Sequence, residues 1–354
     1  MTELPNDLSR PVVLEIGIFD HMDRGESDAS AFYAQRLALT ELYDRLGFYS
    51  YHVAEHHSTP LGLAPSPNVF LSMVAGRTRR LRIGALVYLL PLYHPLRLLE
   101  ELCMLDQMSG GRLDVGVGRG ISPIEAGFYG GQPEKSQAIF EEALAVLLAG
   151  FATRELTFVG EYFQFTDVPV ETAPYQRPHP PLWYGVSSPE SAARCARSGY
   201  NILTLSPPDK AAAVLAPHRA IARETGRPDL FAGIGRFVVV AETDDAARAV
   251  ADAAYPRWYR NFNTLYRKYG RGPVQGERPS TFAGVVDAGT GIAGSPETVW
   301  NALDAQLRAT DANYFVGQFA FGDMPHADAA RSIELFAAEV MPRLLGRAPA
   351  GAVR

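Results

Sequence analysis

Cysteine is rare in this sequence, which has only Cys103 and Cys195 among its 354 residues. The two lie far apart in the chain, in segments with helical spacing, and so small a number argues against a fold built on disulfide bonds. We therefore expect two free thiols that pack in the interior of a cytoplasmic protein.

Three further features are missing. No run of about 18 apolar residues occurs, so no membrane-spanning helix is expected. The opening MTELPNDLSRPVV lacks the basic and then apolar pattern of a secretory signal. The net charge of -6 argues against a nucleic-acid surface, which needs a basic stripe. With 47% apolar and 20% charged residues, the composition is that of an ordinary globular enzyme.

What the sequence does contain is a regular alternation of apolar segments with β-type and helical spacing. Such alternation predicts a parallel sheet with helical crossovers, and this many units over one chain suit a closed barrel. We predict an α/β fold, a single (β/α)8 TIM-like barrel that occupies 1–354 as one domain. The eight predicted strands are 12–19, 49–54, 81–90, 112–117, 182–186, 200–205, 233–241 and 313–320.

Two segments interrupt the alternation of predicted strands and helices, and we predict that they are insertions. The first, near 151–181, contains a predicted hairpin at 156–165 and a proline-rich tail. The second, near 255–292, is rich in aromatic residues at first and in glycine and proline later. The helical spacing of its aromatic residues fits either a stripe facing the core or an apolar wall over the barrel mouth.

Polar residues follow the predicted strands at the edge where parallel barrels bind ligands. Glu55, His56 and His57 come directly after the second strand. Because adjacent residues of an extended segment point to opposite faces, only one histidine should face the mouth, where it could act as a base or donor. Two alternatives stay open: both rings pack locally, or a metal binds with help from His21, His94 and Asp106, although the spacing matches no known zinc pattern.

Two further strand exits carry chemistry suited to a phosphate. Gly116 to Gly120 ends the fourth strand, where glycine lets a ligand approach the backbone and Arg119 offers a planar fork. Ser187 and Ser188 begin a helix after the fifth strand, and a helix N-terminus attracts anions. Each has a simpler interpretation, a tight turn with a solvated arginine and a plain serine cap. The ends of the fourth and fifth strands are neighbours, however, so residues from both could bind the same phosphate.

The sequence resembles the bacterial luciferase-like flavin monooxygenases, especially the luciferase α subunit, along nearly its whole length. The resemblance implies a TIM-like barrel that binds reduced FMN and forms a homodimer or larger homo-oligomer. The matching strings are AEHHSTPLGLAPSPNVF (54–70), RTRRLRIGALVYLLPLYHPLRLLEELCMLDQMSGGRLDVGVGRG (77–120), RWYRNF (257–262), GSPETV (294–299) and VMPRL (340–344).

The resemblance assigns roles to individual residues. His56 matches the family's catalytic histidine, and His57 and Trp258 are expected in the substrate pocket. Arg119 and Ser187 match phosphate contacts, with Ser188 and Ile121 beside them. Leu86 and Val87 match a pair that usually carries a non-proline cis peptide under the flavin ring. Gly118 is expected next to the C4a edge of that ring. No metal ligand is implied.

The sequence also departs from the family at three positions. Gly118 stands where the luciferase α subunit has a reactive cysteine, which argues against light emission as the main role. Gln137 and Glu190 replace an arginine and a threonine that contact phosphate. The affinity for FMN is therefore expected to be modest, which suits a flavin delivered in reduced form by a separate reductase.

The function implied is that of a two-component monooxygenase acting on an apolar organic substrate. It would use reduced FMN and O2, through a C4a-hydroperoxide, for hydroxylation, Baeyer–Villiger oxidation or aldehyde oxidation. The cofactor would supply the reactive chemistry. The protein would position the reactants, exclude water and supply a base. Two other hypotheses are kept: a deazaflavin-dependent hydride-transfer oxidoreductase of the same superfamily, and a non-catalytic flavin-binding subunit.

Overall fold

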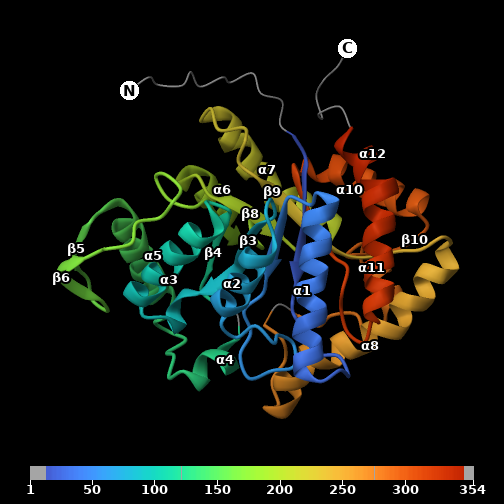
Figure 1. The fold of residues 1–354 in the computed structure, drawn as a ribbon, viewed down its shortest axis with the longest axis horizontal. Helices are drawn as coiled ribbons and strands as arrows, with labels where there is room; N and C mark the ends of the chain where they lie inside the picture. The colour runs from blue at the N-terminus through green and yellow to red at the C-terminus, as the bar shows by residue number, and fades with distance from the viewer. Residues whose placement is uncertain (1–12, 121, 275, 347–354) are drawn as a thin grey trace.

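The computed structural model describes residues 13–120, 122–274 and 276–346, and within them the chain forms a closed parallel barrel (Figure 1). Each strand pairs with the next in sequence around the barrel, and β1 closes it by pairing with β11. The predicted eight-stranded barrel is confirmed. Its strands are β1 Glu15–Asp20, β2 Ser50–Val53, β3 Arg82–Leu89, β4 Leu113–Gly118, β7 Leu182–Gly185, β8 Asn201–Thr204, β9 Ala232–Val240 and β11 Tyr314–Gln318.

Helices surround this barrel, and their termini follow the signals in the sequence. The helix α1 ends at Gly47 with φ at 84°, a backbone conformation that favours glycine. The helices α6 and α10 begin with a serine cap followed by proline. The larger helices are α1 Ala29–Leu46, α2 Pro67–Arg77, α3 Pro95–Ser109, α5 Ser136–Ala152, α6 Pro189–Ser198, α7 Pro208–Glu224, α8 Asp244–Lys268, α10 Pro296–Thr310 and α11 His326–Leu335.

Shorter elements complete the described chain. A 3-10 turn covers Leu90–Leu92, and a π turn at Phe336–Val340 joins α11 to α12. The short helices are α4 Pro123–Phe128, α9 Phe282–Asp287 and α12 Met341–Leu345. None of the helices in the described ranges is both long and apolar enough to cross a membrane.

The first predicted insertion contains the expected hairpin, which projects from the left end of the molecule in Figure 1. It pairs β5 Glu155–Val159 with β6 Gln164–Pro169 in antiparallel fashion. The second insertion begins later than predicted. Helix α8 continues through the aromatic segment to Lys268, and Tyr255 and Trp258, one turn apart, are buried on it. Beyond it, α9 leads into β10 Gly291–Gly294, which pairs with β9 outside the closed barrel.

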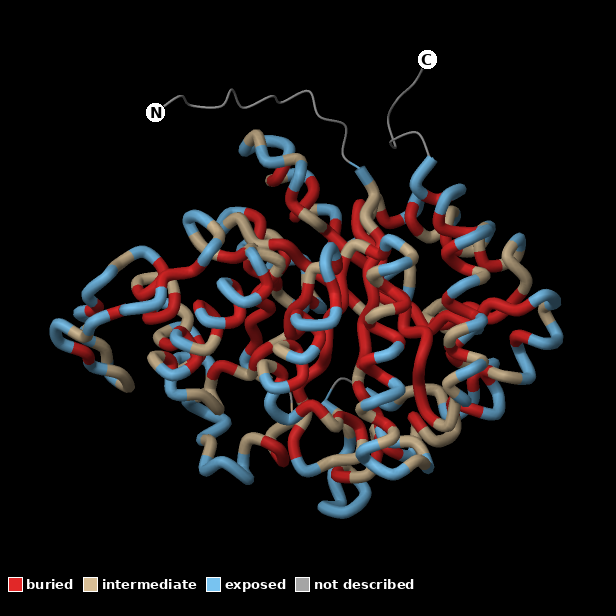
Figure 2. Tube along the Cα trace, in the orientation of Figure 1, coloured by how far each residue is buried: buried red, intermediate tan, exposed pale blue. Residues whose placement is uncertain are grey.

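The strands form the buried centre of the molecule, as Figure 2 shows by burial. Both cysteines are buried and free, Cys103 in α3 and Cys195 in α6, as predicted. At the N-terminal end of the strands the interior is polar: Arg82 donates to Asp114 at 2.7 Å, and His52 contacts the Tyr314 hydroxyl at 2.8 Å.

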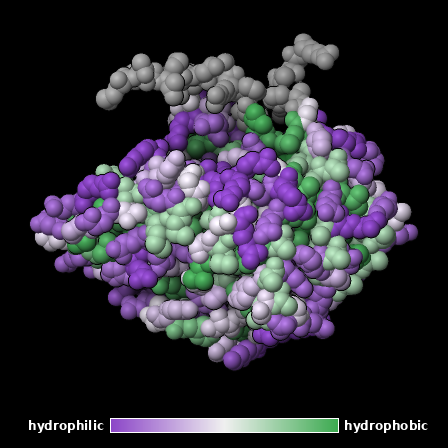
Figure 3. All heavy atoms as spheres, viewed as in Figure 1, coloured by the Kyte–Doolittle hydropathy of each residue, from purple (hydrophilic) through white to green (hydrophobic). Residues whose placement is uncertain are grey.

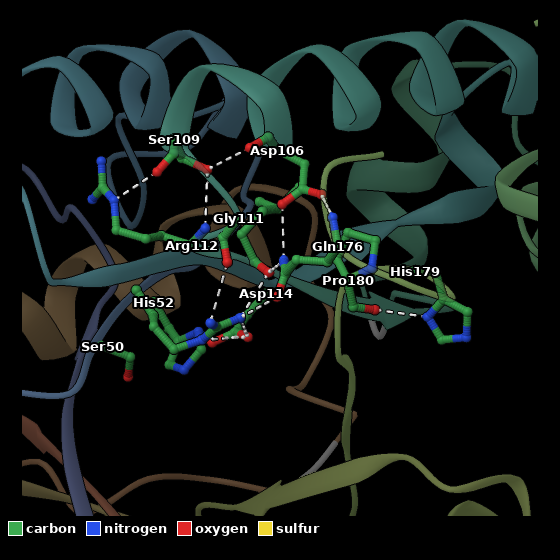
Figure 4. A network of polar contacts seen from close by, with 12 residues as sticks. Ser50, His52, Asp106, Ser109, Gly111, Arg112, Asp114, Gln176, His179 and Pro180 are labelled. Atoms are coloured by element: carbon green, nitrogen blue, oxygen red, sulfur yellow. Dashed lines mark hydrogen bonds and ion pairs between the residues drawn. The ribbon is translucent and has the colours of Figure 1, made fainter. Parts of the chain in front are cut away.

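This polar network connects the barrel to the end of α3 and to the segment that contains Gln176 (Figure 4). Asp106 accepts hydrogen bonds from the backbone and side chain of Gln176, at 2.9 and 2.8 Å, and Arg112 donates to the Ser109 carbonyl at 2.8 Å. Burial lowers the pKa of His52 to about 4, so this ring is neutral at pH 7. The N-terminal end is thus filled, which leaves the opposite end, here called the mouth, for ligands.

Candidate active site

A cavity with about 360 Å³ of empty space lies at the mouth, where β2, β3 and β4 end. We call it the first cavity. It combines an apolar rim with a histidine, two carboxylates and an arginine. Its lining residues are Glu55, His56, Leu89, Leu92, Arg119, Gly120, Ser122, Glu125 and Ala126.

His56 faces this cavity and is held by a carboxylate from a distant part of the chain. Its Nδ1 lies 3.4 Å from both oxygens of Glu125, which also accepts the backbone N–H of His57 at 2.7 Å. Burial raises the pKa of Glu125, but the bond and charge of His56 together with the His57 N–H bring it below its ordinary value. Glu125 is therefore ionised at neutral pH and fixes the orientation of the His56 ring.

His57 points the other way, into the protein. Its Nε2 lies 2.8 Å from Glu55, and its Nδ1 lies 2.9 Å from the hydroxyl of Tyr129. The Glu55 carboxylate also accepts the Tyr93 hydroxyl at 2.9 Å. His57 is buried and is not among the residues that line the two cavities described here, because it alternates with His56 along extended backbone.

The candidate phosphate residues come from neighbouring strand exits. Arg119 is exposed and lines the first cavity, while Ser188 caps α6 by accepting the Ser191 N–H at 3.3 Å. Burial raises the pKa of Tyr184, at the end of β7, and the charges of Arg194 and Arg119 oppose this rise. Both guanidinium groups are thus within electrostatic reach of one hydroxyl at the β7 exit.

The other residues expected at a phosphate are less informative. Ser187 is exposed and lies directly before the cap of α6, outside the lining of both cavities. Ile121 lies outside the described residues.

The bond between Leu86 and Val87 is a non-proline cis peptide, as the resemblance led us to expect. Neither residue is among those that line the two cavities. Gly118 packs against the same segment: a Cβ atom built on it would lie 2.3 Å from Cγ2 of Val87. The Val87 side chain therefore occupies the space that a cysteine at position 118 would need.

A second cavity, with about 450 Å³ of empty space, adjoins the first. Trp258, expected in the substrate pocket, is among the residues that line it. The rings of His21 and His56 form the boundary between the two cavities, with centroids 5.9 Å apart and planes 19° apart. The lining of this second cavity is His21, Leu205, Gly235, Phe237, Tyr255, Trp258, Phe262, Arg278, Pro279, Val285, Thr290 and Gln318.

The described residues contain no group of three or more side chains placed to hold a metal ion. The three residues considered for such a site lie in different surroundings. His21 stacks on His56, His94 packs against Phe163 and Phe165, and Asp106 binds Gln176. Within the described residues these three side chains are therefore not brought together as one group.

Sequence reasoning missed four residues that shape the site: Glu125, Arg194, Arg278 and Gln318. A signal for Glu125 was present, because Ser122 and Glu125 have the spacing of a helix-starting capping box, and Ser122 does accept the Glu125 N–H at 3.3 Å. That spacing predicts where α4 begins, but not that its carboxylate reaches a histidine 69 positions away.

Comparison with known proteins identifies the family. A model of the luciferase-like monooxygenases matches residues 14–313. The chain belongs to this family. Among curated proteins, it is 40% identical over 337 residues to the uncharacterized protein y4wF of Sinorhizobium fredii, covering 94% of this chain and 98% of that one. It is 30% identical over 333 residues to limonene 1,2-monooxygenase of Rhodococcus erythropolis, covering 91% and 84%.

Several solved structures have the same fold. The monooxygenase RslO1 of Streptomyces bottropensis superposes with a TM-score of 0.84 at 28% identity, covering 93% of this chain and 99% of that one. Two more distant structures support the fold alone. The oxygenating constituent of 3,6-diketocamphane monooxygenase from Pseudomonas putida, in complex with FMN, gives 0.78 at 20% identity over 94% and 98%. A coenzyme F420 dependent reductase from Methanopyrus kandleri gives 0.68 at 18% over 94% and 99%.

Proposed function

We propose that this luciferase-like protein is the oxygenase of a two-component system that uses reduced FMN and O2 to oxygenate an organic substrate. The observation that carries the proposal is the His56–Glu125 pair, a histidine that faces a cavity and is held by an ionised carboxylate. A relative of similar sequence, limonene 1,2-monooxygenase, is named for such a reaction. A flavin reductase that delivers the reduced cofactor is the implied partner.

The donors at the exits of β4 and β7 suit the phosphate of FMN. Arg119 and Arg194 supply positive charge at the β7 exit, and the hydroxyl of Ser187 and the N-terminus of α6 lie at the same exit. The chemistry that reduced FMN supplies when bound is the transfer of electrons to O2. The exposed Glu190 in the first turn of α6 adds negative charge here, which should keep the affinity modest.

Within this proposal, the protein's own groups handle a proton and exclude water. The Nε2 atom of His56 is the candidate to take a proton from, or give one to, the reacting molecule, because Glu125 holds the opposite ring nitrogen. The aromatic side chains of Phe237, Trp258 and Phe262 form the apolar part of the second cavity next to it. An apolar surround of this kind limits the access of water to reactive species.

The test measures O2 consumption and product formation with purified protein, a flavin reductase, FMN and a panel of cyclic ketones, terpenes and aromatic compounds. The wild type should consume O2 in a substrate-dependent manner, and His56→Ala should lower the rate by about 100-fold, within the usual range for a lost acid–base group. His94→Ala is the control, because His94 is exposed and its ring contacts Phe163 and Phe165 of the hairpin segment. A His56→Ala protein with wild-type turnover would rule out this role.

A second candidate, hydride transfer with a deazaflavin, is favoured by the shared fold of the F420-dependent reductase. Such an enzyme reduces or oxidises F420 in the absence of O2. Measuring F420 absorbance under anaerobic conditions with the same substrates separates the two functions. Tight flavin binding with no turnover in either assay would support the third hypothesis, a non-catalytic flavin-binding subunit.

We also propose that the chain forms a homodimer or larger homo-oligomer through α2 and α3. These two helices pack against each other, and each carries exposed apolar side chains one turn apart. The exposed fractions are 69% for Val69 and 50% for Met73 on α2, and 54% for Met104 and 58% for Met108 on α3. Exposed apolar residues grouped on neighbouring helices are typical of an interface between subunits.

A further inference from the structure

The second cavity has one wall made of parallel aromatic rings on a single helix. Along α8, the rings of Tyr255 and Trp258 are stacked with centroids 5.4 Å apart and planes 25° apart. Trp258 and Phe262 continue the stack at 5.4 Å and 16°. Phe237, from β9, meets the Trp258 ring edge-on at 4.9 Å. Aromatic side chains of this kind favour an aromatic ligand, because pairs of rings gain free energy beyond the area that they bury.

One basic side chain lines this aromatic cavity. The guanidinium carbon of Arg278 lies 5.8 Å from the centroid of Phe262, the last ring of the stack. The loop that carries Arg278 is fixed to α8, since the Tyr255 hydroxyl donates to the carbonyl of Pro279 at 2.9 Å. This bond ties the backbone next to Arg278 to the helix that carries the aromatic wall.

The remaining polar groups of the lining are neutral at pH 7. Burial lowers the pKa of His21 to about 3, and the charges of His56 and Arg278 lower it too, so its ring carries no charge. Gln318 and Thr290 have neutral side chains. Burial also lowers the pKa of Arg278, but an arginine starts so high that it keeps its charge. The cavity is thus aromatic, with positive charge at one end.

We propose that the second cavity binds a planar aromatic substrate that bears an anionic oxygen, a carboxylate or an ionised phenol, and that Arg278 determines this specificity. The aromatic rings that line the cavity contact the substrate, and the guanidinium group pairs with its anionic oxygen. This inference rests on the proposed function, and it changes the expected substrate from an apolar compound to an aromatic anion. The bond to be oxygenated would then face His56, across the boundary formed by His21.

The chemistry of the cavity fits this class of ligand. A charge-assisted hydrogen bond to arginine is about twice as strong as a neutral one, and arginine can form two in parallel with a carboxylate. A charged ligand should therefore bind better than its neutral isostere.

The experiment compares 2-naphthoate with 2-naphthamide, which has the same shape and no charge, by isothermal titration calorimetry with and without oxidised FMN. The wild type should bind 2-naphthoate about 10-fold or more tightly than 2-naphthamide. In Arg278→Gln the two ligands should bind equally. Arg278→Lys should retain part of the preference, because it keeps the charge and loses the fork.

Two control variants separate charge from shape. Arg271→Gln removes an exposed arginine seven positions before Arg278 and should leave both affinities unchanged. Phe262→Ala should weaken both ligands alike, because it shortens the aromatic wall. A wild type that binds neither ligand, or binds both equally, would overturn the proposal. So would an Arg278→Gln protein that keeps the preference.

Failure of the proposed function would be recognised separately. The titration requires no turnover, so substrate class and oxygenation are measured independently. A preference for 2-naphthoate without O2 consumption would reject the monooxygenase and leave the binding site intact. If Arg278→Gln does not fold, as judged by its thermal unfolding, Arg278→Lys still tests the role of the fork.

Discussion

Glu125 is the residue on which the position of His56 depends. It is buried, comes from the short helix α4, and bridges the His56 ring and the His57 backbone. A carboxylate in such a place is stable because N–H groups surround it. The side chains that shape this site are therefore not limited to those next to the histidines in the chain.

Glu125→Gln should make the protein less stable in a pH-dependent way. The pKa of Glu125 in the folded protein is below its ordinary value of 4.5, so its stabilising effect is fully present above that pH. It is lost as the pH falls through the lower folded value. At pH 7 we expect the free energy of unfolding to fall by about 1.5–3 kcal/mol, the value of a hydrogen bond to a charged group.

Urea unfolding at a series of pH values from 3 to 8 checks this expectation. The difference between wild type and Glu125→Gln should shrink below pH 4, because protonated glutamate resembles glutamine. Glu161→Gln is a matched control, since Glu161 is an exposed acid on the distant hairpin. A difference that grows as the pH falls would contradict the assignment.

At the scale of elements, the strands β3 and β4 are packed so closely that glycine is required between them. A Cβ atom on Gly116 would lie 2.3 Å from the carbonyl oxygen of Ala85, and one on Gly118 would lie 2.3 Å from Cγ2 of Val87. The glycines that suggested a phosphate loop in the sequence thus also serve the contact between neighbouring strands. Arg119, directly after them, is the residue that reaches the cavity.

Gly118→Ala should destabilise the protein by about 1–3 kcal/mol, the usual cost of an extra methyl group in a full interior. The control is Gly76→Ala in α2, where a Cβ atom would meet nothing within 4 Å. Because alanine favours helix more than glycine does, this control should raise stability by about 0.5–1 kcal/mol. Thermal unfolding measures both, and two changes of the same sign would contradict the packing argument.

The order of elements could be predicted because hydrophobic spacing and caps are local. Gly47 ended α1, and the serine and proline before α6 and α10 began those helices, as expected. Helix α8 was harder, because a run of aromatic residues followed by glycine and proline resembles an irregular segment. Its true extent depends on the barrel mouth, against which Tyr255 and Trp258 are buried.

At the scale of the whole molecule, closure of the barrel by β1 and β11 places the ends of eight strands in one ring. Both cavities lie inside this ring and share a wall of two histidines from different strand exits. On the outside, the face seen in Figure 3 mixes hydrophobic patches with larger hydrophilic areas. The apolar residues of α2 and α3 are the basis for the proposed interface between copies.

The double variant Met73→Glu and Met104→Glu should shift the protein from oligomer to monomer in size-exclusion chromatography with light scattering. Burying these exposed side chains favours association by about 25 cal/mol per Å² of apolar area, and added charges would oppose it. Met73→Leu with Met104→Leu is the matched control and should leave the oligomer intact. A wild type that elutes as a monomer at all concentrations would reject the proposed interface.

The sequence by itself determined the alternation of strands and helices, the position of His56 at a strand exit and the free cysteines. These depend on spacing and on composition within short windows. Only the tertiary structure decided that Glu125 holds His56, that His57 turns inward, and that Arg278 lies at the end of an aromatic wall. The physical reason is that such contacts join residues far apart in sequence, and their geometry exists only after the barrel has closed.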